Sequence, residues 1–463
     1  MAKGGRKKLY VFIGFLFLTQ NTFSANLNKW RDGTLSSLDK MRVDTSLIND
    51  GLILETRPND QWTPVLSELT TSPTNLGLDL ILQLDILEHA DFTEDQKAIA
   101  LSKIDSQLNS LAELPFEANS GLFFGWYNPQ NKKVLFGNLS SVDNIHLAFA
   151  LWTAKERLED PIAQKKAEAL FKRMNFSIFF DSEKKLIIGN LLPDANGGWK
   201  SEGYYYSNYG SEARSIYILS YVLGLFDNQG KDWITDSLNH LNFELSASRK
   251  NIRLWDGGAF QLFLPDLLIS ERTYSSSMQE FFKSYAQNMK ELGKNYPAEI
   301  PAAHSACFFK DHEERFFYNG NAGLLSETSQ ENRNSQNPKN VALWEAAFTP
   351  HALLLASLDL EANDLNKLEK LENITENGLS FFRDDLGWLD AWQWKSNSGL
   401  QLVNLQIALD QLMLVLSLNR LSSADKLSVS ARALKENPLS QARLSRYYQE
   451  LDLVLKKVTL AKK

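Results

Sequence analysis

Cysteine and histidine are scarce in this chain of 463 residues, which has 1 Cys and 6 His. A single cysteine, Cys307, cannot form an intramolecular disulfide, so the fold must depend on its hydrophobic core. The histidines are scattered and show no metal-ligand spacing. The sequence therefore indicates neither a metal site nor a cofactor.

The chain also lacks an excess of basic residues. It has 49 Lys and Arg against 56 Asp and Glu, a net charge of −7, which argues against nucleic acid as a partner. With 43% hydrophobic and 23% charged residues, the chain can bury a large core. Its length suits one large helical domain or two ordinary ones, and nothing in it predicts the oligomeric state.

No stretch other than the N-terminus could span a bilayer. A basic stretch at 3–8 precedes apolar residues 9–18 and a polar stretch at 19–25. This layout predicts a secretory signal peptide at 1–25, cleaved near Ser24 or Ala25, with an uncleaved anchor as the alternative. The apolar run is short for a membrane span. We expect an exported protein, periplasmic or secreted, without a stable membrane span after cleavage.

The rest of the chain is dominated by helical patterns. Apolar spacing, N-cap residues and a capping box at Thr93–Gln96 predict the helices listed here: 75–88, 94–114, 143–157, 161–173, 211–226, 277–292, 349–358, 361–377, 404–421 and 439–458. Strand-like patches are short, at 134–136, 185–188 and 316–318. About a dozen helices joined by long aromatic loops favour an all-α toroid of paired helices.

Long loops at one end of such a toroid would form a cleft. The polar tract 326–340 is either a lid over that cleft or an ordinary surface loop.

The stretch 204–214, YYYSNYGSEAR, places a carboxyl group beside aromatic rings. Ser211 is a candidate N-cap, and Glu212 would lie in the first helical turn near Tyr209 and Arg214. Glu212 could simply complement the helix dipole and pair with Arg214. Alternatively, it is a catalytic acid walled by aromatic residues.

Further aromatic and acidic motifs precede other predicted helices. The stretch 121–128, GLFFGWYN, contains Trp126 and Tyr127, and 140–148 contains Asp143. Asp143 is either an N-cap or a residue that faces the cleft, and His146 would share its helical face. The stretch 254–265 joins Trp255 to a glycine turn. The stretch 387–394, GWLDAWQW, surrounds Asp390 with indoles, and apolar surroundings raise the pKa of a carboxyl.

These motifs occur in a fixed order across 71–394: SPTNLGL, GLFFGWYN, SSVDNIHLAFAL, YGSEAR, WDGGAFQLFLP and GWLDAW. In this order they resemble the glucoamylase-like domain of bacterial cyclic β-1,2-glucan synthases and its relatives, the endo-β-1,2-glucanases. The SPTN, VDN and SEAR segments are the most similar. The resemblance implies an (α/α)6 barrel, which we expect at 61–421, after an N-terminal segment at 26–60 and before a helical tail at 422–463.

The sequence departs from the synthase pattern at its carboxylates. Gln261 stands where that pattern has a Glu, and a segment ending in His304-Ser305 stands where it reads GISES. Asp390 stands at the Glu of its YEA segment. These differences make the hydrolytic glucanases the better guide, and they place a Glu at the position of Glu212.

The resemblance thus implies an exported glycoside hydrolase of a glucan, most consistent with β-1,2 linkages. Glu212 would be the general acid and Asp390 the general base of an inverting hydrolysis. The expected substrate-binding residues are Asp143, His146, Trp126, Tyr127, Tyr209, Arg214, Trp255, Gln261, His304 and Trp388. The alternative is a catalytically inactive, carbohydrate-binding envelope protein that keeps the cleft.

Overall fold

The computed structural model describes residues 26–42, 52–53, 56–58, 70–211, 213–230, 232–245, 252–254, 258–294, 305, 307–310, 316–319, 346–365, 367–373, 375–376, 379–384, 387–395, 399–403 and 405–461. Glu212, Trp255 and His304 lie outside these residues, as do the predicted signal peptide and the tract 326–340.

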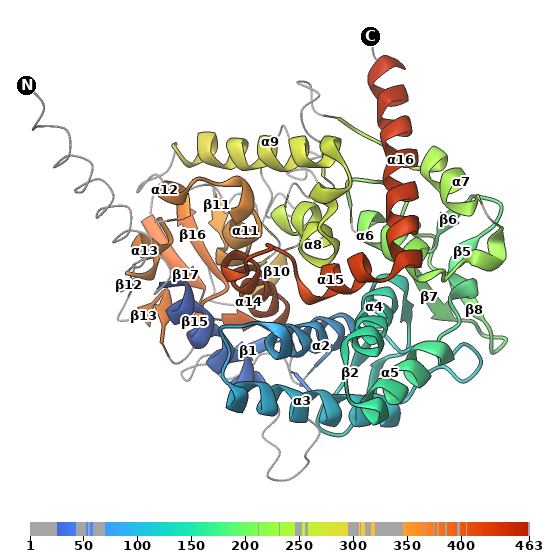
Figure 1. The fold of residues 1–463 in the computed structure, drawn as a ribbon, viewed down its shortest axis with the longest axis horizontal. Helices are drawn as coiled ribbons and strands as arrows, with labels where there is room; N and C mark the ends of the chain where they lie inside the picture. The colour runs from blue at the N-terminus through green and yellow to red at the C-terminus, as the bar shows by residue number, and fades with distance from the viewer. Residues whose placement is uncertain are drawn as a thin grey trace, which may run out of the picture.

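Six of the described helices form a closed inner ring. Each contacts the next in chain order, and the last contacts the first (Figure 1). They are α2 (Pro73–Glu88), α4 (Ser141–Arg157), α6 (Ala213–Leu223), α8 (Ala259–Ile269), α11 (Pro350–Leu355) and α14 (Ala408–Ser422). Nearly every residue of α2, α4 and α14 is buried, as expected for helices enclosed on all sides. The ring confirms the predicted (α/α)6 barrel.

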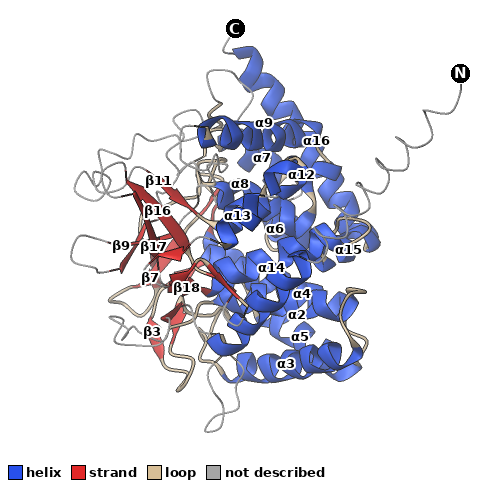
Figure 2. Ribbon diagram, turned by 90° about the vertical axis from the view of Figure 1, so that its left-hand side faces the viewer, coloured by secondary structure: helices blue, strands red, loops and turns tan. Residues whose placement is uncertain are grey.

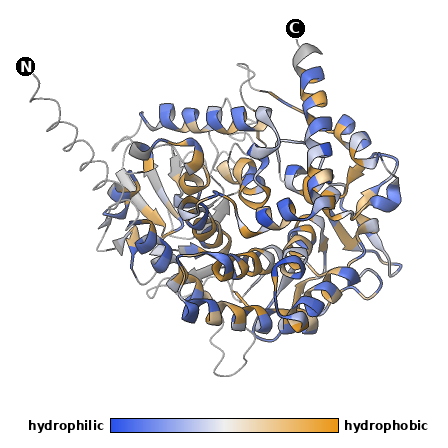
Figure 3. Cartoon of the chain, viewed as in Figure 1, coloured by the Kyte–Doolittle hydropathy of each residue, from blue (hydrophilic) through white to orange (hydrophobic). Residues whose placement is uncertain are grey.

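An outer layer of amphipathic helices surrounds the ring. In Figure 3 the helices α3 and α9 alternate hydrophilic and hydrophobic residues along their length. The outer helices are α3 (Glu94–Glu113), α5 (Pro161–Arg173), α7 (Trp233–His240), α9 (Ser276–Gly293), α12 (Ala362–Leu365) and α13 (Lys367–Glu372). Thr93 forms the predicted capping box at the start of α3. Short 3-10 turns occur at η1 (Phe176–Phe179), η2 (Asp227–Gln229), η3 (Glu271–Thr273) and η6 (Ser357–Asp359).

The C-terminal ends of the inner helices are covered by the end of the chain. Helix α15 (Val429–Glu436) contacts α2, α4 and α8, and α16 (Pro438–Ala461) contacts α6 and α7. Ser430 donates to the Leu268 carbonyl at the end of α8, and Arg432 pairs with Asp85 and Glu88 at the end of α2. This end of the ring is therefore closed.

The other end of the ring carries the strands, which Figure 2 shows on one side of the helical body. Strands β4 (Leu139–Ser140), β11 (Ala346–Phe348) and β18 (Leu405–Ile407) end within one residue of the N-termini of α4, α11 and α14. The pairings between the strands of the described residues are antiparallel. The paired strands are β1 (Thr56–Pro58) with β18 (Leu405–Ile407), β2 (Trp126–Tyr127) with β3 (Val134–Phe136), β5 (Phe180–Asp181) with β6 (Leu186–Ile187), β9 (Cys307–Lys310) with β10 (Phe316–Asn319), β12 (Thr375–Glu376) with β13 (Leu379–Ser380), and β14 (Phe382–Arg383) with β15 (Gly387–Trp388).

Two of the sheets have three strands. The first contains β4 (Leu139–Ser140), β7 (Asn190–Pro193) and β8 (Trp199–Ser201). The second contains β11 (Ala346–Phe348), β16 (Ala391–Lys395) and β17 (Gly399–Val403). This second sheet includes residues 391–394 of the predicted indole-rich stretch 387–394, whereas Gly387 and Trp388 form β15 of another sheet. No helix was predicted at 259–269, which overlap the loop motif 254–265, but these residues form the inner helix α8.

The N-terminal helix at 26–41 packs against the ring. Its Trp30 is fully buried, donates to Glu372 across 2.8 Å, and lies edge-on to Trp388. Arg42 forms a bidentate ion pair with Asp79 in α2. No helix among the described residues is long and apolar enough to span a membrane.

Candidate functional site

The strand-bearing end of the ring collects the first turns of the inner helices. Thr74 in α2, Asp143 in α4, Arg214 in α6 and Gln261 in α8 all come from these turns. His351 in α11 and Asp410 in α14 complete the set. A helix N-terminus presents unpaired N–H groups and partial positive charge, so this end favours ligands or side chains rich in oxygen. Most sequence-predicted site residues lie at this end.

Thr74, Asp143 and His146 form one cluster between α2 and α4. The Thr74 hydroxyl donates to Oδ1 of Asp143 across 2.5 Å and lies 3.5 Å from Nδ1 of His146. Because the one hydroxyl proton goes to Asp143, Nδ1 of His146 must be the donor to Thr74. The N-cap of α4 is Ser140, which accepts from the Asp143 backbone N–H. The N-cap role considered for Asp143 is therefore wrong.

Gly77 brings the two helices of this cluster close together. A Cβ atom at this position would lie 3.0 Å from the Cα of Leu147 and 3.1 Å from the carbonyl oxygen of His146. Only a residue without a side chain allows this approach, one turn after Thr74. The SPTNLGL motif therefore contributes both a hydrogen-bonding residue and the glycine that positions it.

Burial sets the protonation of the cluster. It raises the pKa of Asp143, against the hydrogen bonds from Ser140 and Thr74, which lower it. It lowers the pKa of His146 to about 4, so the imidazole is neutral near pH 7. Nε2 of His146 is buried and has no hydrogen-bond partner among the described residues. Asp143 is only half-buried, and so remains accessible to a ligand.

The aromatic loop 121–127 is fixed to the same helix by Asn144. The Asn144 side chain accepts from Phe123 N–H across 2.8 Å and donates to the Phe123 carbonyl across 2.9 Å. Trp126 is half-buried in β2, and its ring is partly exposed. Tyr127 is fully buried, with its hydroxyl donating to the Pro115 carbonyl and accepting from Phe124 N–H. This burial corrects the stacking role predicted for Tyr127.

Tyr209 and Trp388 are likewise core residues with 0% exposure. Tyr209 stacks on Phe243 with ring centroids 4.5 Å apart. Trp388 packs against Trp30 and Phe382. Neither ring presents a face to a saccharide, so their predicted stacking roles are corrected as well.

Arg214 is buried in an ion pair with Glu271, which the sequence analysis did not identify. Its Nη1 lies 2.5 Å from Oε2 of Glu271, and its Nη2 donates to the carbonyls of Gln261 and Leu262. Pro265 lies four residues after Gln261 and has no N–H, so it cannot donate to that carbonyl within the helix. Arg214 replaces the missing donor. It therefore fastens α6 to α8, in place of the sugar-positioning role predicted for it.

Asp390 lies between β15 and β16 and is 1% exposed. The preceding segment is fixed by Gln406 and Gln411, which both donate to the Trp388 carbonyl. Asp410 immediately precedes Gln411, and its Oδ2 atom lies 3.2 Å from Nδ1 of the buried His351. Burial lowers the pKa of His351 to about 3. A base that acts on water needs access to it, and Asp390 has far less access than Asp143.

Three predicted site residues, Glu212, Trp255 and His304, lie outside the described residues. Their described sequence neighbours lie at the starts of α6 and α8. Helix α6 begins at Ala213, two residues later than predicted, and Ser305 accepts from the Phe260 N–H at the start of α8. Gln261 is half-buried in the first turn of α8. The described residues contain no group of His, Cys, Asp and Glu that could hold a metal ion.

Sequence reasoning missed Thr74, Glu271, His351 and Asp410. Thr74 lies inside the SPTNLGL motif, which supported the family resemblance but was given no site residue. His351 and Asp410 follow strand-to-helix junctions at 349–351 and 407–410, and such polar residues in a first turn were the available signal. Glu271 follows a long apolar run, which gives no indication of its partner.

The overall arrangement matches several solved structures of saccharide-active proteins. A variant of an endo-β-1,2-glucanase from Talaromyces funiculosus, in complex with β-1,2-glucan, has a TM-score of 0.72 at 10% identity, over 94% of this chain and 92% of that one. The endo-β-1,2-glucanase from Chitinophaga pinensis, in complex with sophorotriose and glucose, has a TM-score of 0.64 at 12% identity, over 92% of this chain and 98% of that one. This chain has the glucoamylase-like (α/α)6-barrel fold.

A putative glucoamylase from Bacteroides caccae also shares this fold, with a TM-score of 0.64 at 12% identity over 92% of this chain and 98% of that one. No family model and no curated protein matches the sequence. The fold that the motif order implied is thus confirmed by structure, at identities too low to transfer an activity.

Proposed function

We propose that this protein is an exported glycoside hydrolase that cleaves a β-1,2-linked glucan. The observation that carries the proposal is the cluster of Thr74, Asp143 and His146, at the N-terminal end of a ring shared with endo-β-1,2-glucanases. A half-buried carboxyl of raised pKa beside a neutral imidazole can hold, donate or accept a proton near neutral pH. Export rests on the signal-peptide pattern at 1–25.

We assign the general acid to Glu212, the residue that directly precedes α6. It would protonate the glycosidic oxygen as the leaving group departs, while a second carboxylate activates water on the opposite face of the sugar. The sequence predicts Asp390 as that base. Asp143 is the better supported candidate, because it is half-buried while Asp390 is 1% exposed.

Binding would draw on the neighbouring polar and aromatic groups. Trp126 is half-buried and is the candidate for stacking on a pyranose face. His146 is buried, so it would act on the site through Thr74 and Asp143, and its predicted contact with the sugar is corrected.

Gln261 and Trp255 remain proposed contacts because they begin or precede α8. His304 remains one because the next residue, Ser305, accepts from the Phe260 N–H at the start of α8.

Hydrolysis of linear β-1,2-glucan by the purified protein, measured as new reducing ends, tests the proposal. Glu212→Gln should abolish activity, and Asp143→Asn should reduce it by roughly 10²-fold or more, as for other acid–base groups. Asp390→Asn decides between the two candidate bases: retained activity in this variant favours Asp143 as the base, and lost activity favours Asp390. Glu168→Gln in the outer helix α5 is the matched control. Unchanged activity in Glu212→Gln would overturn the role of Glu212, and inactivity on a panel of glucans would overturn the enzyme.

A second candidate function is saccharide binding without hydrolysis. It is favoured by the burial of Asp390 and by Gln261 at a position where related domains carry an acid. In that case calorimetry would detect binding of β-1,2-glucan oligosaccharides, and no product would form over long incubation. Hydrolysis of the glucan by the wild type, absent in Glu212→Gln, would exclude this second function.

A further inference from the structure

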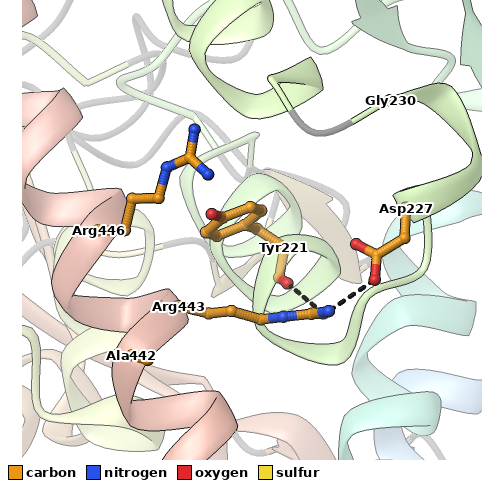
Figure 4. A pocket seen from close by; sticks show the side chains of 6 residues that line it. All are labelled: Tyr221, Asp227, Gly230, Ala442, Arg443 and Arg446. Carbon is orange, nitrogen blue, oxygen red and sulfur yellow. Dashed lines mark hydrogen bonds and ion pairs between the residues drawn. The ribbon is translucent and has the colours of Figure 1, made fainter.

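A pocket of about 380 Å³ lies at the closed end of the ring, away from the candidate site. Figure 4 shows the side chains of Tyr221, Arg443 and Arg446 gathered between α6 and α16. Asp227, Gly230 and Ala442 complete the lining. Tyr221 lies in the last turn of α6, whereas Arg214 lies in its first. Because α6 has 11 residues, the two ends are roughly 16 Å apart.

One wall of the pocket is held rigid by Arg443. Its guanidinium donates to the Tyr221 carbonyl across 3.0 Å, at the C-terminal end of α6, and to Oδ2 of Asp227 across 2.6 Å. Gly224 has a positive φ of 72°, and a Cβ there would lie 2.4 Å from Arg443 Nη1. The wall is therefore ordered before any ligand arrives, which lowers the entropic cost of binding.

The opposite wall is accessible and can exchange partners. Arg446 lies one helical turn after Arg443 on α16 and donates to Oδ1 of Asp232 across 2.8 Å. The side chains of this pair are 43% and 75% exposed, so solvent competes for the ion pair. A ligand hydroxyl can take the place of either partner at small cost.

The charges of the pocket favour a neutral, hydroxyl-rich ligand. Each guanidinium is already paired with a carboxylate, Asp227 or Asp232. The C-terminal end of α6 adds partial negative charge, which disfavours a phosphate or sulfate. The lining holds donors on Arg443 and Arg446 and acceptors on Asp227 and the Tyr221 carbonyl, and the hydroxyls of a sugar can pair with both kinds of group. The volume lies near the lower limit of small-molecule sites and suits a short oligosaccharide.

We propose that this pocket is a second, non-catalytic saccharide-binding site that holds part of the glucan chain remote from the cleavage site. The identity of the glucan rests on the proposed function. The advantage is bivalency: a long chain held at two places dissociates more slowly than a short one held at one.

Calorimetry with sophorose, the β-1,2-linked disaccharide, tests the site in a Glu212→Gln background that prevents turnover. Two binding events are expected. Arg446→Ser removes the accessible guanidinium, and Ala442→Trp fills the pocket without removing a hydrogen bond. Each should abolish one event, whereas Lys435→Ser on the exposed face of α15 should retain both. In the active protein, Ala442→Trp should raise KM for long glucan roughly threefold or more and leave kcat unchanged.

The outcomes separate this inference from the proposed function. Hydrolysis by the wild type with identical sophorose binding in Arg446→Ser and Ala442→Trp would overturn the second site alone. If both variants lose a sophorose-binding event but the wild type never hydrolyses glucan, the proposed hydrolase activity would be overturned and the second binding site would stand. Sulfate binding that Arg446→Ser abolishes, without sophorose binding, would show that the pocket takes anions and would contradict the assignment.

Discussion

Arg214 and Glu271 form a buried ion pair, with Nη1 of the arginine 2.5 Å from Oε2 of the glutamate. The pair joins three parts of the barrel, because Tyr448 of α16 donates to Oε1 of Glu271 across 2.8 Å. Arg214 also donates to the Gln261 carbonyl, which Pro265 leaves without a helical donor, and to the Leu262 carbonyl. The guanidinium next to the proposed acid in sequence is thus committed to holding α6, α8 and α16 together.

Loss of this arginine should destabilise the fold. Arg214→Met removes the buried charge partner of Glu271, which keeps only the hydrogen bond from Tyr448 among the described residues, and it removes the side-chain donor of the Gln261 carbonyl. It should lower the free energy of unfolding by about 3–5 kcal/mol. Urea unfolding measures the difference. Arg446→Met, which breaks a solvent-exposed ion pair, is the matched control and should cost less than about 1 kcal/mol. Equal effects in the two variants would contradict the role given to Arg214.

Glu271 should make stability fall as pH rises. Burial raises its pKa from 4.5 to about 7, although Arg214 favours the charged form. Between these values the unfolded chain loses the proton first, so ionisation favours unfolding, by an amount on the order of 3 kcal/mol in total. Comparing Glu271→Gln with the wild type from pH 4 to 8 isolates this contribution. The free energy of unfolding of Glu271→Gln should not fall over this pH range as that of the wild type does. Parallel curves of stability against pH for the two proteins would contradict the role given to Glu271.

The buried histidines should act in the opposite direction. Burial lowers the pKa of His146 to about 4 and of His351 to about 3, from 6.5. Below pH 6.5 these histidines become protonated in the unfolded chain but stay neutral in the native state. The free energy of unfolding therefore falls as pH falls, by about 3 kcal/mol or more for each group. Thermal unfolding between pH 7 and 4 should show a shallower loss for His146→Gln. The exposed His240→Gln is the control and should follow the wild type.

Gly77→Ala should separate α2 from α4. The added Cβ meets backbone atoms of Leu147 and His146 at 3.0–3.2 Å, and backbone cannot yield as a flexible side chain does. We expect a loss of stability of about 1–3 kcal/mol and a larger loss of hydrolysis, because Thr74 would move away from Asp143. Gly137→Ala is matched, since nothing lies within 4 Å of a Cβ there. Full activity in Gly77→Ala would show that the spacing is not critical.

Thr74→Val should shift the pH dependence of hydrolysis. The threonine hydroxyl stabilises the ionised form of Asp143, so its removal should raise the pKa of that carboxyl further. If Asp143 is the base, the acidic limb of the kcat profile moves to higher pH. The control is Thr153→Val, which removes a buried hydroxyl that bonds only within α4. An unchanged profile with reduced kcat would assign Thr74 to binding alone.

Local signals in the sequence predicted most of the helices. The capping box at Thr93 and the Asp160-Pro161 start of α5 are encoded within a few residues, and both helices begin where expected. The prediction was wrong at α8, because two glycines and Pro265 indicate a turn when neighbours are unknown. Arg214, from another helix, supplies the donor that makes a helix possible there.

For the site, the sequence alone determined which polar residues stand at helix starts, because motif order and capping patterns are local. It thereby placed Asp143 and His146 on one face of α4, which their shared contact with Thr74 confirms. Only the tertiary structure decided which aromatic residues are exposed and which cations are already paired. Tyr127, Tyr209 and Trp388 are buried in the core, and Arg214 pairs with Glu271. Neither result could be read from local sequence, because burial and ion pairing depend on distant segments that close the ring.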